Sequence, residues 1–259
     1  MIWQEISGSW ILIGRRPIGI VHFLGGAFVG GAPNITYRYL LEQLGKAGYA
    51  VIATPFVNTF DHGAIARSVL NRFENILERL QATNALGQSY LPIYGIGHSM
   101  GCKLHLIIGS VFPVERAGNI LISFNNYPVR RAIPFIEQLE LDATLNLEFT
   151  PSPEETNLLI AKHYEVRRNL LIRFTNDEID QTSTLNPVLQ ERFPNMVASL
   201  SLPGNHLTPL GQNVNWNWQP GEIFTPFDAI GQWVKQGFSG DLERLNQEIL
   251  RWLNPVMSF

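Results

Sequence analysis

Three segments of this chain carry the residue types of nucleophilic catalysis. Ser99 lies between two glycines in GIGHSMG, and later segments hold carboxylates in TNDEID and a histidine in PGNHLTP. A serine hydroxyl is a weak nucleophile until an imidazole accepts its proton, and a carboxylate must orient that imidazole and stabilise its cation. Ser99, Asp177 and His206 are therefore the candidate nucleophile, acid and base. Asp180 is a second candidate for the acid.

The glycines around Ser99 have three possible explanations. Gly95, Gly97 and Gly101 spell GxGxxxG, which differs by one position from the dinucleotide-binding fingerprint, and the sequence contains no GxxxxGK[ST] segment. A chain with 22 glycines also produces such patterns by chance. The third explanation is a sharp turn from strand to helix that holds the serine in strained backbone angles. Apolar runs on both sides of the motif favour this turn, in which the Met100 N–H would face an oxyanion.

The bulk properties limit the class of protein. The chain has 259 residues, of which 45% are hydrophobic and 16% charged, and its net charge is −3. We interpret residues 1–259 as a single α/β domain with no nucleic-acid partner, since nucleic-acid binders are usually basic. The single cysteine, Cys102, excludes an internal disulfide and a multi-cysteine zinc site. We predict no metal, no cofactor and no stable membrane anchor, and a cytoplasmic location; the sequence does not predict an oligomeric state.

Strand and helix patterns alternate along the chain. Parallel strands that are covered on both faces are continuous apolar runs, and six such runs occupy residues 18–24, 49–56, 91–96, 119–124, 169–174 and 196–202. Helical patterns cover residues 34–48, 64–81 and 241–255, with Asp61 as the predicted cap of the second. This alternation predicts a parallel sheet flanked by helices.

One connection is longer than a single crossover needs. It contains a helical pattern that begins with Ser152 at the cap and Pro153 at the first position. We predict that residues 128–167 form a small helical cap insertion.

The candidate acid and histidine each follow a predicted strand. Loops at the carboxyl ends of parallel strands form the binding crevice of an open α/β sheet. We therefore expect Ser99, Asp177 and His206 to meet at this edge. The residues expected to line the substrate site there are Phe28, His98, Phe124 and Asn125.

The segments YGIGHSMG, RFTNDEID and LPGNHLTP resemble the nucleophile, acid and histidine segments of the α/β-hydrolase superfamily. VHFLGGAFVGGAP is similar to its oxyanion loop, and the chain also resembles an uncharacterised group typical of cyanobacteria and plastids. The resemblance begins near residue 18 and implies the α/β-hydrolase fold with a mostly parallel, eight-stranded sheet. The oxyanion strand of this superfamily usually ends in His-Gly, which is absent here. The N–H of Gly26 or Ala27 is expected to complete the oxyanion hole.

The resemblance implies a serine hydrolase that needs no cofactor. Its expected partner is a small-molecule acyl substrate, an ester or thioester of hydrophobic character. The missing His-Gly leaves an alternative, a non-catalytic protein of the same fold that binds a ligand or a partner.

Overall fold

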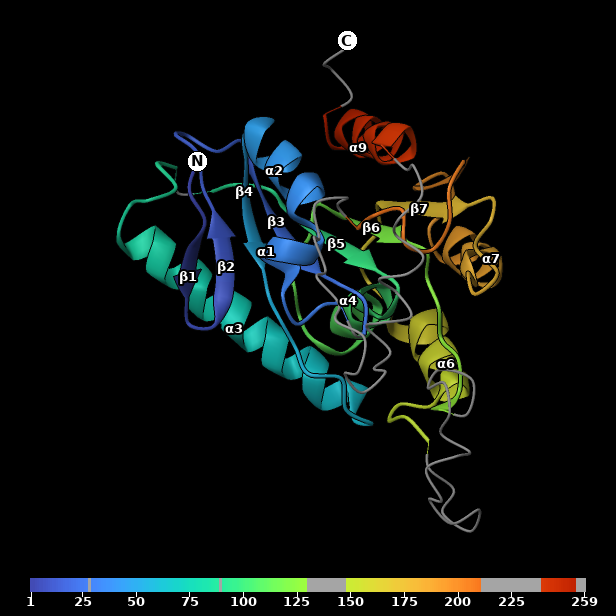
Figure 1. Cartoon of the computed structure of the whole chain (residues 1–259). Coiled ribbons are helices and arrows are strands. Elements are labelled where there is room, and N and C mark those ends of the chain that lie inside the picture. The colour runs from blue at the N-terminus through green and yellow to red at the C-terminus, as the bar shows by residue number, and fades with distance from the viewer. Residues whose placement is uncertain (28, 89, 130–147, 211–238, 255–259) are drawn as a thin grey trace, which may run out of the picture.

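The computed structural model describes residues 1–27, 29–88, 90–129, 148–210 and 239–254 (Figure 1). Within them, eight strands form one sheet in the order β1-β2-β4-β3-β5-β6-β7-β8. The first two pairs in this order, β1–β2 and β2–β4, are antiparallel, and all the other pairs are parallel. The strands are β1 (Gln4–Ile6), β2 (Ser9–Leu12), β3 (Gly19–Leu24), β4 (Tyr49–Ala53), β5 (Ile93–His98), β6 (Gly118–Ile122), β7 (Asn169–Phe174) and β8 (Val197–Leu202). The predicted fold class, a mostly parallel eight-stranded sheet, is confirmed.

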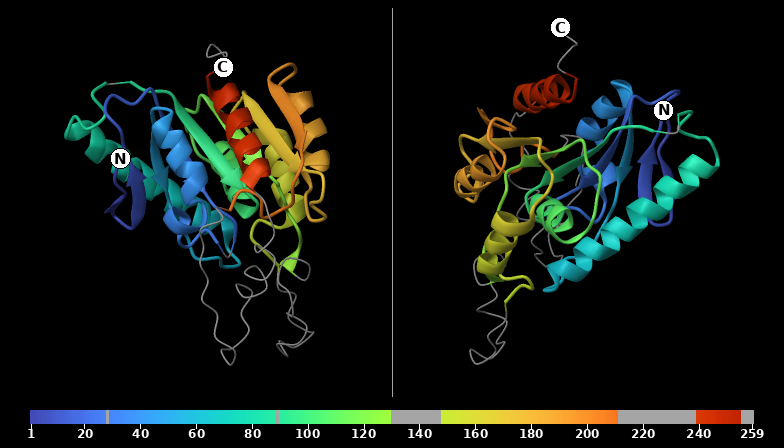
Figure 2. Two further views of the ribbon diagram at one scale, coloured as in Figure 1. Left: turned by 45° about the horizontal axis from the view of Figure 1, so that its top comes forward. Right: turned by 180° about the vertical axis from the view of Figure 1, so that it is seen from behind.

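Helices cover both faces of this sheet. They are α1 (Pro33–Thr36), α2 (Arg38–Lys46), α3 (His62–Ala82), α4 (Met100–Val111), α6 (Pro153–His163), α7 (Thr182–Arg192) and α9 (Ser239–Leu253). Helices α2 and α9 lie over one face, and α3, α4, α6 and α7 lie over the other (Figure 2). In the described part of the chain, no helix is both long enough and apolar enough to cross a membrane.

The central strands form because their residues are apolar on both sides. Every residue of β3, β4 and β6 is buried, as expected for parallel strands between two helical layers. Side chains alternate between the layers, so Phe23 packs toward α2 while Leu24 packs toward α3 and α4. This sandwich fixes the carboxyl ends of the parallel strands along one edge.

Side-chain caps start two of the helices. The Ala64 N–H donates to the Asp61 carboxylate at 2.8 Å, which confirms the predicted cap of α3. Helix α6 starts with a capping box, in which the Ser152 hydroxyl and the Glu155 carboxylate each accept a backbone N–H.

The helix predicted over residues 34–48 is broken in the structure. Tyr37 has φ −114° and ψ 19°, so α1 ends before it and α2 begins after it. Helix propensity alone gave no sign of this break. The break directs the Tyr37 ring toward the site described below.

The expected cap insertion is only partly within the described residues, because residues 130–147 lie outside them. Its described helix, α6, packs beside α4, and Ile160 is fully buried in the core between α4 and α7. This helix belongs to the layer that covers the sheet. The cap itself remains an expectation.

Candidate active site

Ser99 occupies a strained turn between β5 and α4. Its backbone angles are φ 54° and ψ −119°, which a residue with a side chain adopts only where the surrounding structure enforces them. A Cβ at Gly97 would lie 2.6 Å from the Cys102 nitrogen, and one at Gly101 would lie 2.0 Å from the Leu24 oxygen. Both glycines are therefore steric requirements of the turn. This geometry fits the nucleophile turn better than a phosphate-binding loop.

His206 and Asp177 meet at the same edge of the sheet. His206 Nδ1 lies 2.8 Å from Asp177 Oδ2, although the two residues are 29 positions apart in the sequence. His206 follows β8 in a turn that the Asn205 side chain closes by accepting the Leu207 N–H. The other oxygen of Asp177 accepts the Ile179 N–H at 3.2 Å. Both side chains are thus oriented before any substrate arrives.

The structure distinguishes the two candidate acids. Asp180 accepts hydrogen bonds from the Thr182 N–H and hydroxyl, and burial raises the pKa of its carboxyl. Burial acts in the same direction on the Asp177 carboxyl. There, the hydrogen bond and charge of His206 outweigh burial and hold the pKa below its ordinary value. Asp177 is therefore ionised, and of the two candidate acids it is the one that contacts the His206 imidazole.

The hydroxyl of Ser99 is held by Asn125. Asn125 Nδ2 donates to Ser99 Oγ at 3.0 Å from the loop after β6, so Asn125 reaches the site as expected. Within the described residues, no hydrogen bond joins Ser99 Oγ to His206. Catalytic hydrogen bonds are often long without substrate and tighten in the substrate complex.

The candidate oxyanion donors have different environments. Met100 is the first residue of α4, so its N–H has no acceptor inside the helix. The Gly26 N–H instead donates to the Tyr37 hydroxyl at 2.8 Å, and the Gly26 carbonyl accepts the Gly30 N–H. The expectation for Gly26 is corrected, because its N–H is already used. Ala27 keeps an N–H with no hydrogen bond to any other described residue.

Two of the expected substrate-binding residues are buried away from the crevice. The Phe124 ring is 1% exposed and packs with Cys102 and Leu106 in the core beside α4. The His98 ring is also 1% exposed and bonds to Tyr37 and to the backbone of His206. Neither ring lines the substrate site, since protein atoms enclose both. Phe28 lies outside the described residues.

Tyr37 is the residue at this site that the sequence did not indicate. Its hydroxyl lies 2.7 Å from His98 Nδ1 and 2.8 Å from the Gly26 nitrogen, and its ring is fully buried. A tyrosine within an apolar helical pattern gives no sign that its hydroxyl reaches two other loops. The broken helix at Tyr37 is visible only in three dimensions.

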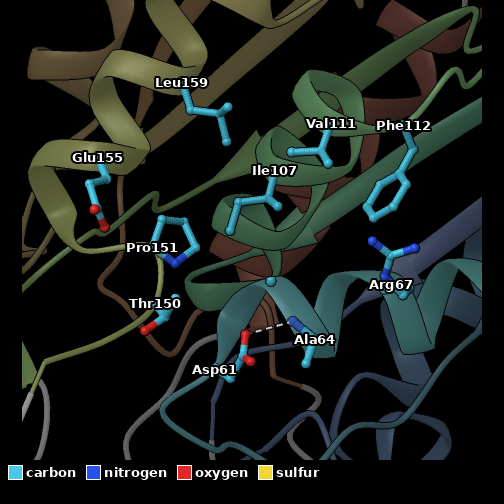
Figure 3. Close-up of a pocket in the computed structure, with 11 residues that line it drawn as sticks. Asp61, Ala64, Arg67, Ile107, Val111, Phe112, Thr150, Pro151, Glu155 and Leu159 are labelled. Atoms are coloured by element: carbon cyan, nitrogen blue, oxygen red, sulfur yellow. Dashed lines mark hydrogen bonds between the residues drawn. The ribbon is translucent and has the colours of Figure 1, made fainter.

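A groove of about 540 Å³ lies among α3, α4 and the start of α6 (Figure 3), and none of the three candidate catalytic residues lines it. Its lining on α4 begins with Ile107, eight residues and thus about 12 Å of helix beyond Ser99. Its charges already have structural roles, because Asp61 and Glu155 cap helices and the Arg67 guanidinium lies over the Phe112 ring. The groove is not part of the candidate active site. Across the described ranges, no three His, Cys, Asp or Glu side chains gather as a metal site would require.

Comparisons with solved structures identify the fold. A dienelactone hydrolase from Anabaena variabilis is 15% identical, with a TM-score of 0.58 over 99% of this chain and 97% of that chain. A monoacylglycerol lipase from Paleococcus ferrophilus is 16% identical, with a TM-score of 0.57 over 98% of each chain. A fluorophosphonate-binding serine hydrolase from Staphylococcus aureus is 11% identical, with a TM-score of 0.53 over 79% of this chain and 90% of that chain. These similarities confirm the α/β-hydrolase fold.

The sequence comparisons give a narrower assignment. No curated protein matches the sequence. A family model described as "Protein of unknown function (DUF1350)" matches residues 2–255. The α/β-hydrolase fold, with Ser99, Asp177 and His206 at one edge of its sheet, is thus found here in a chain that belongs to the DUF1350 family.

Proposed function

We propose that this protein is a serine hydrolase that cleaves an ester or thioester. The observation that carries the proposal is the hydrogen-bonded pair of His206 and Asp177 at the edge of the sheet where Ser99 occupies its strained turn. A buried aspartate bonded to Nδ1 leaves Nε2 of a neutral imidazole free to accept a proton. The arrangement supplies a base that is already in the required tautomer.

The proposed reaction has two steps. His206 Nε2 takes the proton of Ser99 Oγ while the oxygen attacks the acyl carbonyl, and the protonated imidazole then gives that proton to the leaving group. Water, activated by the same imidazole, cleaves the acyl-serine and restores the hydroxyl. The Met100 and Ala27 N–H groups are the proposed oxyanion donors.

Asn125 has a proposed role in the resting state. Its amide donates to a lone pair of Ser99 Oγ, so the hydroxyl proton remains available for His206. As that proton leaves, the same N–H stabilises the negative charge that grows on Oγ.

The proposed substrate class comes from proteins that share the fold. Solved structures with this fold include a dienelactone hydrolase, a monoacylglycerol lipase and a thioesterase domain from the curacin biosynthetic pathway. They support a hydrophobic acyl substrate for this protein. The cytoplasmic location likewise stays a prediction from the sequence.

Two observations favour the second candidate, a non-catalytic ligand-binding protein of this fold. Ser99 Oγ accepts its hydrogen bond from Asn125, and the N–H of Gly26 is already used by Tyr37. Both features reduce the number of groups that are free for catalysis in the resting state.

A fluorophosphonate probe separates the two candidates, because it reacts covalently only with an activated serine. We expect the wild-type protein to be labelled at Ser99, and the Ser99→Ala variant to remain unlabelled while keeping the same circular dichroism spectrum. A folded wild-type protein that resists labelling and hydrolyses no p-nitrophenyl ester would support the ligand-binding candidate instead.

A further inference from the structure

Tyr37 and His98 form a continuous hydrogen-bonded chain between three loops. The Gly26 N–H bonds to Tyr37 Oη at 2.8 Å, and Tyr37 Oη bonds to His98 Nδ1 at 2.7 Å. His98 Nε2 bonds to the His206 carbonyl at 2.9 Å. The chain starts in the oxyanion loop after β3, passes through Tyr37 between α1 and α2 and through His98 at the end of β5, and ends at the candidate base after β8.

The direction of each hydrogen bond in this chain is determined by its end groups. The backbone N–H of Gly26 can only donate, and the carbonyl of His206 can only accept. Nε2 of His98 must therefore carry the ring proton, which leaves Nδ1 as an acceptor for the Tyr37 hydroxyl. Burial, together with His206, lowers the pKa of His98 to about 3, so the imidazole is neutral. Burial also raises the pKa of Tyr37, so its hydroxyl keeps its proton.

We propose that Tyr37 and His98 are positioning residues that hold the oxyanion loop, the nucleophile turn and the base in one arrangement through this directed chain. The inference rests on the proposed hydrolase function. His206 is held at two points, its carbonyl by His98 and its ring by Asp177. At the other end, the chain directs the Gly26 N–H inward and leaves the next N–H, that of Ala27, for the oxyanion. Misplacement of either end by about 1 Å is enough to cost about a hundredfold in rate.

Substitutions that remove one link at a time test this role. With p-nitrophenyl butyrate as the probe substrate, Tyr37→Phe is expected to lower kcat about 30-fold and His98→Leu about 100-fold, while KM changes less than about threefold. His98→Gln keeps an N–H near the Nε2 position and should recover at least about a tenth of the wild-type kcat. His98→Asn keeps only the group that faces Tyr37 and should not recover it. The double variant Tyr37→Phe/His98→Leu should be no slower than His98→Leu alone, because both changes break one chain.

Two outcomes would overturn the proposal. One is a folded His98→Leu variant with wild-type kcat, and the other is a double variant whose losses are additive. A Gln variant no faster than the Leu variant would also count against the link to the His206 carbonyl. Tyr37→Phe is nearly isosteric, so it keeps the test valid if His98→Leu fails to fold.

A measurement that needs no turnover separates this proposal from the proposed function. Nitrogen-15 NMR of the labelled wild-type protein should show His98 protonated at Nε2 and bare at Nδ1 between about pH 5 and about pH 9. A protonated Nδ1 at neutral pH would refute the directed chain even in an active enzyme. If His98 has the expected tautomer but the protein has no esterase activity, the proposed function is refuted and the hydrogen-bonded chain is not.

Discussion

Two pairs of histidines in this molecule are held in different ways. At the carboxyl edge of the sheet, hydrogen bonds join the His98 ring to Tyr37 and to the His206 carbonyl, and the His206 ring to Asp177. We call these two residues the edge pair. Each ring bond fixes a tautomer, and a base needs a fixed tautomer.

The second pair, His22 and His105, lies deeper between β3 and α4, and we call it the core pair. His22 Nδ1 accepts from the Arg116 guanidinium at 3.1 Å, and its ring stacks on Phe73 with 4.2 Å between centroids. In the described structure, the Nε2 atoms of both core histidines have no hydrogen-bond partner. The core pair is therefore held by ring packing together with hydrogen bonds that leave the Nε2 atoms unused. Both ring nitrogens of His98 are hydrogen-bonded, whereas each core histidine leaves its Nε2 without a partner among the described residues, so burial alone does not show that a histidine belongs to the candidate site.

The largest expected effect concerns the edge pair and tests which carboxylate orients His206. Asp177→Asn removes the carboxylate that fixes the His206 tautomer, and it should slow fluorophosphonate labelling about a thousandfold or more. The matched control is Asp180→Asn, which should stay within about threefold of wild type, because Asp180 bonds to Thr182 instead. Labelling rates measured by mass spectrometry give both values. Equal losses in the two variants would contradict the assignment of the acid.

The next effect concerns the core pair and should appear in stability, not in rate. His22→Ala leaves a cavity beside Phe73 and removes the acceptor of Arg116, so the free energy of unfolding should fall by about 3 kcal/mol. Urea denaturation measures this loss. The folded fraction should still be labelled at the wild-type rate. A loss of labelling without a loss of stability would remove the distinction between the two pairs.

These contrasts also show how far the sequence could predict the molecule. The six apolar runs gave the parallel strands, because strands covered on both faces leave a continuous apolar pattern. The β1–β2 hairpin was missed among those runs, since β1 has three residues and two of them are exposed. A short strand with few buried residues leaves only a weak apolar pattern in the sequence.

The residues of the candidate site also differ in how far the sequence could predict them. Ser99, Asp177 and His206 were predictable because the acid and histidine each follow a strand. The roles of Gly26 and His98 were not, because both depend on the Tyr37 hydroxyl and on a break in a helix with ordinary propensity. His98 and His206 are 108 residues apart, and no local pattern reports such a contact.

A smaller effect on activity is expected at Asn125. Asn125→Ala removes the N–H that stabilises charge on Ser99 Oγ, and it should lower kcat for p-nitrophenyl butyrate about 30-fold, or about 2 kcal/mol. Asn125→Asp is the matched variant, since a carboxylate of the same size would repel the developing charge and should be slower still. Faster turnover in Asn125→Ala would instead mean that the amide restrains the hydroxyl and competes with His206.

The last effect lies in the pH dependence of stability, to which one histidine of each pair, His98 and His105, contributes. Burial is the main reason that the pKa values of His98 and His105 fall to about 3, below the ordinary value of 6.5. Between these values the unfolded chain binds more protons than the folded protein, so the free energy of unfolding rises with pH.

Stability is therefore lost as the pH falls below the pKa of histidine in the unfolded chain, by about 1.4 kcal/mol per pH unit for each histidine. Urea denaturation between about pH 4 and about pH 5.5 should show this slope, and His98→Gln and His105→Gln should each reduce it by one histidine's share. His163→Gln, which removes an exposed imidazole, is the control for losing a histidine from the surface. If His98→Gln reduced the slope and His105→Gln did not, burial would not be keeping His105 neutral in the folded state, and the comparison of the two pairs would fail at that residue.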